Sequence, residues 1–314
     1  MSASEKKNIL RKILGKSISK GSEELFYCPS CKHHKPKLSI NIEKNVFKCW
    51  VCDYSSNNIR RLVRRFGNFL ELSRWDEFTQ EVDISVSLYE KLFPKKGEQN
   101  YAEETVEMPK EFISLANKQI PMTALSAKKF LRDRGITQQD IVRWKIGFCN
   151  DGPYAGRVVV PSFGLSGKLN YFVARSYESH FNKYKNPPAS KDIVFNNLYV
   201  DWDNDLCLVE GVFDAIVAGN AVPLLGSTLS ERSALFKEIL KNDTPVFLAL
   251  DSDAEKKAIK LVKSLLKYGL EVYKIDIKPY KDVGSMTKQD FSLRKNAAVV
   301  MNHDNLIHYQ LENL

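Results

Sequence analysis

The stretch VFLALDSDAEKKAIKLVKSLLKYG, Val246 to Gly269, decides the fold expected of this chain. It begins with an apolar run, Val246–Leu250, that predicts a buried strand. From Ala254 it continues with the spacing of an amphipathic helix. Asp251 and Asp253 lie between the two, separated by one serine. Two carboxylates at the tip of a buried strand repel each other, so their placement needs a physical reason.

The same alternation of strand and helix extends over residues 206–277. The predicted strands are LCLVE (206–210), AVPLLG (221–226), PVFLAL (245–250) and EVYKIDI (271–277). The predicted helices are GVFDAIVAG (211–219), SERSALFKEILK (230–241) and AEKKAIKLVKSLLKYG (254–269). Apolar strands that alternate with helices indicate a parallel sheet covered on both faces. Ligands of such sheets gather at the carboxyl ends of the strands.

Three carboxylates are expected at those ends. Glu210 ends one predicted strand, and Asp251 and Asp253, two residues apart, would point the same way on an extended chain. Three packed anions are unfavourable without a cation, and hard oxygen ligands of this kind suit Mg2+ or Mn2+. The alternative is structural, because aspartate often caps the helix that follows a strand. One aspartate can be a cap, but two beside a glutamate favour metal binding.

Four of the six cysteines form a second pattern, CPSCKHHKPKLSINIEKNVFKCWVC. Cys28, Cys31, Cys49 and Cys52 stand as two C-x2-C pairs that predict one structural zinc ion held by four thiolates. Two short predicted strands with a turn at 43–45 separate the pairs, as in a zinc-ribbon hairpin. The alternatives are two disulfides, which the absence of a secretory signal pattern disfavours, or unpaired thiols. His33 and His34 are close enough to replace a cysteine, but are expected on an exposed loop.

The net charge of +9 is unevenly distributed. Residues 1–70 hold 15 Lys and Arg against 5 Asp and Glu, whereas the rest of the chain holds 32 against 33. This asymmetry indicates a polyanionic partner, most simply nucleic acid, although a solubilising surface has the same composition. Lys32, Lys35, Lys37 and Trp50 combine cations with an aromatic ring, which suits single-stranded nucleic acid. The arginines of NNIRRLVRRFG (57–67) fit either such a surface or the solvated face of a helix.

The remaining segments suggest how the chain is divided. The N-terminal stretch 1–16 predicts a short basic amphipathic helix, residues 58–93 predict further helices, and the polar stretch 94–111 predicts a linker. Residues 121–148 predict two helices, the second capped by Thr137, and residues 157–177 a hairpin. We therefore expect a zinc-ribbon domain (1–93), the linker (94–111), a mixed α+β basic subdomain (112–203), a parallel-sheet domain (204–290) and a helical tail (291–314).

The motifs LVEGVFDAI and LALDSDAEKK resemble the two signatures of the TOPRIM fold, a Rossmann-like metal-binding domain shared by bacterial-type primases and topoisomerases. Three upstream segments, FLRDRGITQQDIVRWKIGF, GRVVVPSFGLSGKLNYFVARSY and NKYKNPPAS, resemble the basic subdomain of bacterial and phage replicative primases. Together with the zinc ribbon, the resemblance covers roughly residues 25–285 in the order of the family.

The resemblance implies a DNA primase, a nucleotidyltransferase that makes short RNA primers on single-stranded DNA. Glu210, Asp251 and Asp253 would hold one or two Mg2+ or Mn2+ ions, with Asp214 and Asp282 as further acidic site residues. The basic residues that would face template, nucleotide or triphosphate are Arg157, Lys168, Arg175 and Lys183. The implied partners are single-stranded DNA, ribonucleoside triphosphates and a separate replicative helicase, because the chain has no P-loop motif of its own.

The chain departs from the family pattern at two points. Its zinc pattern has four cysteines, as in phage primases, where bacterial primases usually include a histidine. Gly284 stands where the family often has a second acid after Asp282. The role of that position is therefore open.

Three other interpretations share parts of the pattern. Recombination-mediator proteins pair a four-cysteine zinc motif with a TOPRIM domain and bind DNA without catalysis, and small TOPRIM nucleases use the same carboxylates to cut. A type I topoisomerase fits least, because the chain is short for the strand-gate domains of that family. The sequence holds no run of 18 apolar residues, so we expect no membrane span and a cytoplasmic protein.

Overall fold

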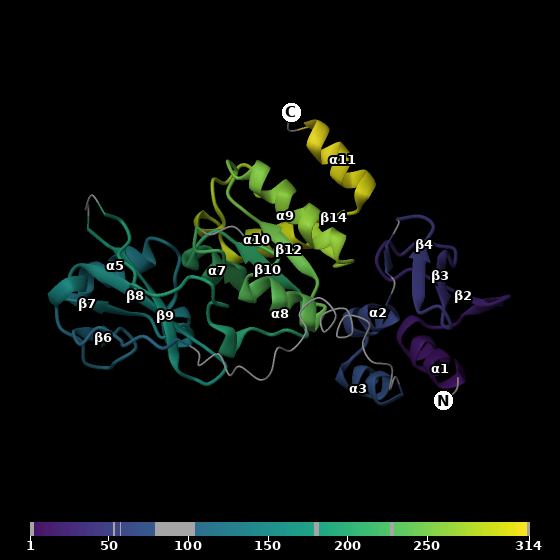
Figure 1. The fold of residues 1–314 in the computed structure, drawn as a ribbon, viewed down its shortest axis with the longest axis horizontal. Helices are drawn as coiled ribbons and strands as arrows, with labels where there is room; N and C mark the ends of the chain where they lie inside the picture. The colour runs from purple at the N-terminus through teal and green to yellow at the C-terminus, as the bar shows by residue number, and fades with distance from the viewer. Residues whose placement is uncertain are drawn as a thin grey trace. The chain divides into compact units, whose positions relative to one another are not determined.

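A computed structural model describes residues 3–52, 54–56, 58–78, 104–178, 182–226 and 229–312 (Figure 1). The chain divides into two compact units, Met1–Leu92 and Phe93–Leu314. No helix within the described ranges has the length and apolar character needed to cross a membrane.

The first unit contains an antiparallel sheet in the strand order β1-β2-β3-β4-β5. The strands are β1 (Ile18–Lys20), β2 (Glu23–Phe26), β3 (Leu38–Asn41), β4 (Val46–Cys49) and β5 (Ser55–Ser56). The hairpin of β3 and β4 confirms the predicted zinc ribbon, and its turn is closed by Asn45 with a positive φ of 55°. Asn tolerates this left-handed conformation better than most residues do.

Three helices cover this sheet: α1 (Ala3–Leu14), α2 (Ile59–Phe66) and α3 (Phe69–Phe78). Helix α1 confirms the predicted amphipathic segment, because Ile9 and Leu10 are buried in the core while its basic residues face outward. Gly67 separates α2 from α3, and a Cβ there would lie 2.6 Å from the carbonyl oxygen of Val63. The predicted helix at residues 86–93 lies outside the described residues.

The second unit begins with an antiparallel sheet and two helices. The strands are β6 (Phe112–Ser114), β7 (Gly147–Cys149), β8 (Arg157–Phe163) and β9 (Leu169–Ser176), and the helices are α5 (Ala124–Arg132) and α6 (Gln138–Arg143). Strands β8 and β9 form the predicted hairpin. Thr137 caps α6 as predicted, because its hydroxyl accepts from the Asp140 N–H and the Asp140 carboxylate accepts from the Thr137 N–H.

Part of the predicted linker is tied into this sheet. Its first ten residues, 94–103, lie outside the described residues. Further along, the N–H of Val106 donates to the carbonyl of Leu169 at 3.0 Å. Val106 and Met108 also pack against the buried Cys149 and Phe172. Residues 104–111 therefore follow the fold of the second unit, although their polar composition alone indicates a linker.

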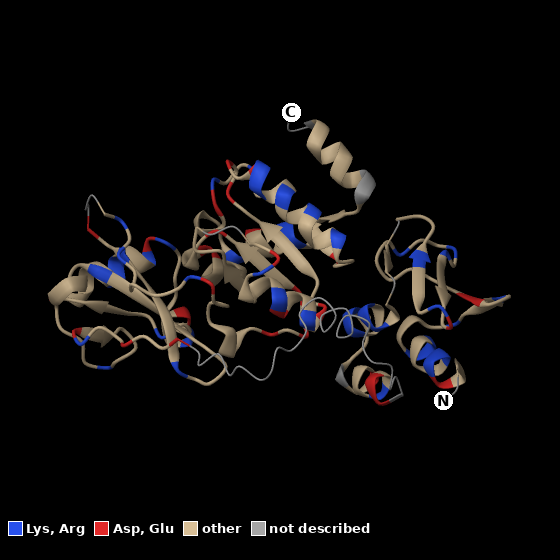
Figure 2. Cartoon of the chain, viewed as in Figure 1, with Lys and Arg blue, Asp and Glu red and all other residues tan. Residues whose placement is uncertain are grey.

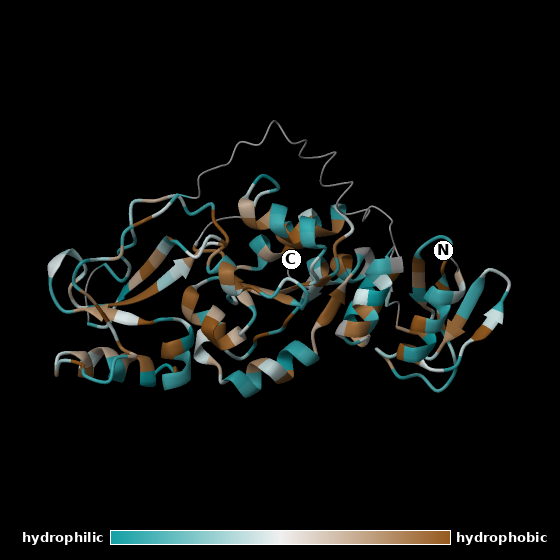
Figure 3. Cartoon of the chain, turned by 90° about the horizontal axis from the view of Figure 1, so that it is seen from below, coloured by the Kyte–Doolittle hydropathy of each residue, from teal (hydrophilic) through white to brown (hydrophobic). Residues whose placement is uncertain are grey.

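The predicted parallel sheet follows, in the order β11-β10-β12-β13-β14. Its parallel strands are β10 (Leu206–Val209), β11 (Ala221–Pro223), β12 (Val246–Ala249) and β13 (Val272–Lys274). The helices are α7 (Val212–Ala218), α8 (Ala234–Asn242), α9 (Glu255–Lys267), α10 (Lys288–Asn296) and α11 (His303–Glu312). Hydrophobic residues are concentrated on the strands and on the inner helix faces (Figure 3), so this sheet carries much of the core.

The C-terminal segment differs from the helical tail that we predicted. Between α10 and α11 the chain forms β14 (Val299–Met301), which pairs antiparallel with β13. The apolar run there is too short for a helix of its own, and the free edge of β13 offers it hydrogen-bond partners. The prediction of a purely helical tail is therefore wrong at this strand.

Candidate functional site

The four cysteines predicted to bind zinc converge in the first unit. Their Sγ atoms all lie within 4.8 Å of one another, with 3.8 Å between Cys28 and Cys52 and 3.9 Å between Cys31 and Cys49. A tetrahedron with Zn–S bonds of about 2.3 Å has edges of about 3.8 Å, so the arrangement fits zinc. Burial raises the pKa of the Cys52 thiol to about 11, which a bound cation would reverse. No disulfide links these residues.

The predicted nucleic-acid surface of the ribbon is accessible. Lys32, Lys35 and Lys37 are exposed, and the Trp50 side chain is 65% exposed. Trp50 donates its backbone N–H to the Lys37 carbonyl at 3.0 Å, and the Lys48 ammonium lies 5.1 Å from the centre of its ring. Figure 2 shows further Lys and Arg on α1 and α2. The ribbon thus presents an exposed ring among cations.

The predicted acidic residues meet in the second unit, at the carboxyl ends of the parallel strands. Glu210 follows β10, Asp214 lies in the first turn of α7, Asp251 follows β12, and Asp282 precedes a short 3-10 turn at Val283–Ser285. All four line one pocket of about 1010 Å³. The other lining residues are Arg134, Val173, Arg175, Tyr184, Asn186, Lys191, Gly211, Val212, Phe213, Leu225 and Gly226.

Asp251 has the side-chain environment that best suits cation binding. Its Oδ1 atom is buried and accepts no hydrogen bond. Burial, followed by the charges of Asp214 and Glu210, raises the pKa of Asp251 to about 7. A buried carboxylate oxygen without a donor is costly for the fold unless a cation binds it. The donor set of this pocket therefore fits a divalent metal with oxygen ligands.

Asp214 has a different environment, because both of its oxygens accept hydrogen bonds from the backbone. Oδ2 accepts from the Gly211 N–H at 2.8 Å, and Oδ1 accepts from the Gly284 N–H at 2.7 Å. Burial raises the pKa of Asp214 to about 6, although these two hydrogen bonds act in the opposite direction. Asp214 thereby joins the start of α7 to the loop that carries Asp282.

This contact explains the departure at Gly284. A Cβ at position 284 would lie 2.8 Å from Oδ1 of Asp214. Any larger residue would therefore push the Asp214 carboxylate away from the Gly284 N–H. Gly284 allows a close backbone approach where the family often has a second acid.

Asp253 does not line the pocket with the other acids, and its side chain is exposed. We predicted that Asp251 and Asp253 point the same way on an extended chain, but β12 ends at Ala249 and residues 251–253 lie in a turn. Within the described part of the chain, no three carboxylates approach one another as closely as the four thiols do.

Arg134 also lines this pocket, although the sequence alone did not indicate it as a site residue. Its guanidinium stacks on Phe130 at 4.8 Å and on Phe213 at 5.1 Å from the ring centres. Arg175, which was predicted, stacks on Phe213 at 5.5 Å and donates to the Tyr184 hydroxyl. Burial and the neighbouring Arg175 lower the pKa of Arg134. Arg134 lies in the turn after α5, where nothing local distinguishes it from a solvated arginine.

The other predicted basic residues do not line this pocket. Arg157 is buried, and its guanidinium donates to the carbonyls of Asn182 at 3.1 Å and Lys183 at 3.3 Å. It therefore holds the loop that follows β9, in contrast to the predicted contact with nucleotide or template. Lys168 is exposed in the turn between β8 and β9, and the Lys183 side chain is exposed on the loop.

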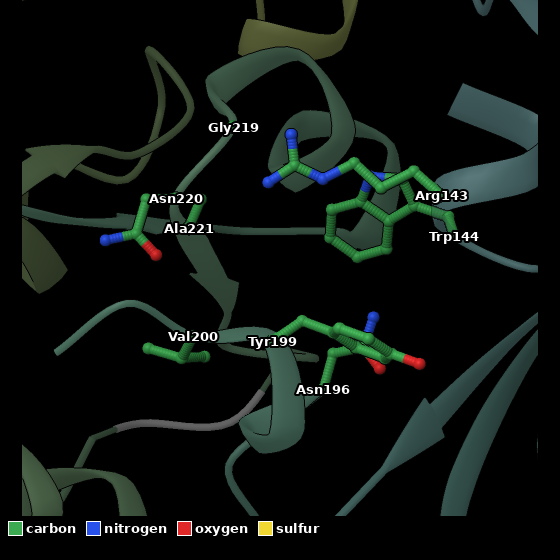
Figure 4. Close-up of a pocket in the computed structure, with 8 residues that line it drawn as sticks. All are labelled: Arg143, Trp144, Asn196, Tyr199, Val200, Gly219, Asn220 and Ala221. Atoms are coloured by element: carbon green, nitrogen blue, oxygen red, sulfur yellow. The ribbon is translucent and has the colours of Figure 1, made fainter. Parts of the chain in front are cut away.

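A second pocket, of about 310 Å³, lies at the amino end of β11 (Figure 4). Arg143 and Trp144 line one side, and Asn196, Tyr199 and Val200 line the other. It is also lined by Gly219, Asn220 and Ala221. It contains none of the predicted site residues and lies at the opposite end of the strands from Glu210 and Asp251, so we do not assign it to the acidic site.

Fold and site define a class of protein in which a zinc ribbon precedes a parallel sheet with acidic residues gathered at the carboxyl ends of its strands. No family model matches the chain. Its sequence is 23% identical to the DNA primases of Clostridium acetobutylicum (84% of this chain, 51% of the relative) and Thermotoga maritima (86% and 55%). It is 24% identical to the DNA primase of Mycoplasma pneumoniae (82% and 51%). The chain thus spans about half the length of the curated relatives that it matches.

Solved structures show the same fold. The DnaG primase catalytic domain bound to single-stranded DNA superposes with a TM-score of 0.52 at 19% identity, covering 62% of this chain and 76% of the other. The E. coli primase catalytic core superposes with a TM-score of 0.50 at 19% identity, covering 62% and 78%. The predicted fold class and the resemblance to bacterial-type DNA primases are therefore confirmed.

Proposed function

We propose that this chain is a DNA primase that synthesises short RNA primers on single-stranded DNA, as a nucleotidyltransferase. The observation that carries the proposal is one pocket of about 1010 Å³ that is lined both by the acids Glu210, Asp251 and Asp282 and by the arginines Arg134 and Arg175. Acids that hold metal and cations that neutralise phosphate are the two requirements of phosphoryl transfer. Similarity to curated DNA primases over most of the chain supports the same assignment.

Glu210, Asp251 and Asp282 would hold one or two Mg2+ or Mn2+ ions, and Asp253 is proposed as an outer member of the set. When bound, such ions lower the pKa of a ribonucleotide 3′-hydroxyl and neutralise charge on the triphosphate. Asp214 is proposed as a positioning residue, because both of its oxygens already accept backbone hydrogen bonds.

Arg134 and Arg175 are proposed to bind the triphosphate or the template phosphate. The centres of their guanidinium groups lie 5.1 and 5.5 Å from the centre of the Phe213 ring, and this contact reduces the ordering that anion binding would require. Lys191 lines the same pocket and donates to the Leu225 carbonyl at 3.4 Å, a long contact that a phosphate oxygen would replace. Lys168 and Lys183 stay proposals for more distant template contacts.

The zinc ribbon is proposed to bind single-stranded template through Lys32, Lys35, Lys37 and Trp50, with one structural zinc ion on the four cysteines. Phosphates would lie on the lysines and a base would stack on Trp50. A separate replicative helicase is proposed as the partner that delivers the template. The domain boundaries 93/94, 111/112, 203/204 and 290/291 also stay proposals.

A priming assay tests this function. The protein is incubated with single-stranded DNA, labelled ribonucleoside triphosphates and Mg2+, and the products are separated by length. We expect short RNAs that start with a triphosphate, and we expect Asp251→Asn to lose at least about 100-fold in rate, the order expected when a charge-stabilising group is removed. Asn keeps the shape of the side chain while removing its charge.

The products separate the proposed function from its rivals. DNA fragments without RNA would indicate a TOPRIM nuclease, and binding without either product would indicate a recombination mediator. Primer synthesis by Asp251→Asn at the normal rate would refute the metal assignment. A Lys260→Met variant, changed at an exposed position of α9, is the control and is expected to prime normally.

A further inference from the structure

Lys257 lies in the first turn of α9, four residues after Asp253, and its ammonium contacts Glu210 on the neighbouring strand. The Nζ atom lies 2.8 Å from Oε2 and 3.1 Å from Oε1 of Glu210. One ammonium group thus contacts both of the oxygens that Glu210 would offer to a metal ion. None of the roles proposed above uses Lys257.

The position of this lysine is unfavourable without its partner. A cation in the first turn of a helix faces the positive end of the helix dipole, which disfavours it. The side chain of Lys257 is only 23% exposed and that of Glu210 only 19%, so solvent screens the pair less than it screens a surface ion pair. The contact with Glu210 therefore holds the ammonium where it is.

The Lys257 ammonium contacts Glu210, whereas Oδ1 of Asp251 has no hydrogen-bond donor. The two acids therefore differ in charge compensation, because the Glu210 carboxylate is paired with an ammonium and the buried oxygen of Asp251 is not. A metal ion that enters the pocket would meet one carboxylate oxygen without a donor, on Asp251, and one carboxylate already paired with an ammonium, on Glu210. A metal ion and the Lys257 ammonium are therefore both attracted to the Glu210 carboxylate.

We propose that Lys257 competes with the metal ion for Glu210, as a built-in cation that stabilises the metal-free site and is released when the metal binds. This inference rests on the proposed metal site and adds a residue that sets its affinity. The competition weakens metal binding in the absence of nucleotide. The ammonium also offsets part of the repulsion between Glu210 and Asp251.

A Mn2+ titration of the zinc-loaded full chain, followed by electron paramagnetic resonance without nucleotide, tests the competition. Lys257→Met removes the competing ammonium and is expected to tighten Mn2+ binding about 3- to 30-fold, the range for loss of a partly buried charge-assisted contact. Lys256→Met is the matched control, because Lys256 is the exposed neighbour and loses the same charge without touching Glu210. It is expected to stay within about twofold of the wild type.

Lys257→Arg provides the rescue, because a guanidinium keeps the paired charge and should keep Mn2+ affinity near the wild-type value. Equal shifts in Lys257→Met and Lys256→Met, or weaker binding in Lys257→Met, would overturn the competition. If Asp251→Asn loses Mn2+ binding while Lys257→Met binds Mn2+ like the wild type, the competition by Lys257 is wrong and the metal site stands. If Asp251→Asn binds Mn2+ as tightly as the wild type, the metal site itself is wrong, and the competition falls with it.

Discussion

At the scale of single residues, the pocket is organised by the distribution of hydrogen-bond donors among its acids. Asp214 receives two backbone N–H groups, Glu210 receives the Lys257 ammonium, and the buried oxygen of Asp251 receives none. Charge and hydrogen bonding therefore assign different roles to residues of one chemical type. These contacts support the proposal that Asp214 positions the neighbouring loops and that Asp251 binds a cation.

Gly284 supplies the sharpest test at this scale. A Gly284→Ala change places a Cβ 2.8 Å from Oδ1 of Asp214 and should break the hydrogen bond to the Gly284 N–H. We expect a loss of about 1–3 kcal/mol in unfolding free energy, measured by urea denaturation.

A double-mutant cycle with Asp214→Asn checks the cause. The two changes disrupt one contact, so their effects should be clearly less than additive. Full additivity would mean that Gly284 acts through a neighbour other than Asp214.

At the scale of elements, short-range caps and long-range contacts act on the same side chains. Asp140 completes the cap of α6 and also pairs with Lys288 of α10, 148 residues away. The cap can be anticipated from Thr137 and Asp140 three residues apart. The partner on α10 becomes apparent only when the chain has folded.

The Asp140 cluster predicts a pH-dependent stability. Burial tends to raise the pKa of Asp140, but hydrogen bonds from Lys288 and Thr137 outweigh it and lower the pKa. A carboxyl group with a lowered pKa stabilises the fold fully at pH values above its unfolded pKa of about 3.9. This stabilisation is lost as the pH falls further and the carboxylate is protonated in the folded state. Asp140→Asn should therefore cost about 1–2 kcal/mol in unfolding free energy at pH 7.

Thermal unfolding at several pH values provides the measurement. The difference in melting temperature between Asp140→Asn and the wild type should become smaller as the pH falls below about 4. Gln139→Ala, at the exposed neighbour, should show no such narrowing. A gap that is constant with pH would exclude the ionised carboxylate as its cause.

The zinc knuckles are the second test at the element scale. Cys49→Ser removes one thiolate of the cluster and should abolish the zinc content, which we expect to be one ion per chain in the wild type by atomic emission. Without zinc the β3–β4 hairpin should open, because the closed site contributes directly to folding. Cys149→Ser, also buried but outside the cluster, should keep its zinc.

At the scale of the whole molecule, the two units differ in charge. The basic excess lies in residues 1–70, whereas the acidic pocket lies in the second unit. We therefore expect a polyanion to be attracted to the ribbon and metal ions to the acidic pocket of the parallel sheet. This separation supports a division between template binding and chemistry.

Salt-dependent DNA binding tests that division. Removal of Lys35 and Lys37 by change to alanine should weaken binding to single-stranded DNA and reduce the slope of log affinity against log salt by about 0.7 for each lost phosphate contact. Fluorescence anisotropy at several salt concentrations measures both. The same change at Lys260 and Lys263 of α9 is the control, and an equal effect there would contradict a role specific to the ribbon.

The sequence by itself determined the zinc cluster, the order of the elements from β10 to α9 and the resemblance to primases, because metal spacing, apolar periodicity and contiguous motifs are local properties. Only the tertiary structure decided which acids line the pocket and why position 284 requires a glycine. It also decided that Arg134 and Arg175 line the same pocket and that the Lys257 ammonium contacts Glu210. Each of these depends on residues distant in sequence that meet at the strand ends, where the contacts of a side chain are set by the sheet and its neighbours. The edge strand β14 and the buried role of Arg157 arose in the same way, because their partners lie on other segments.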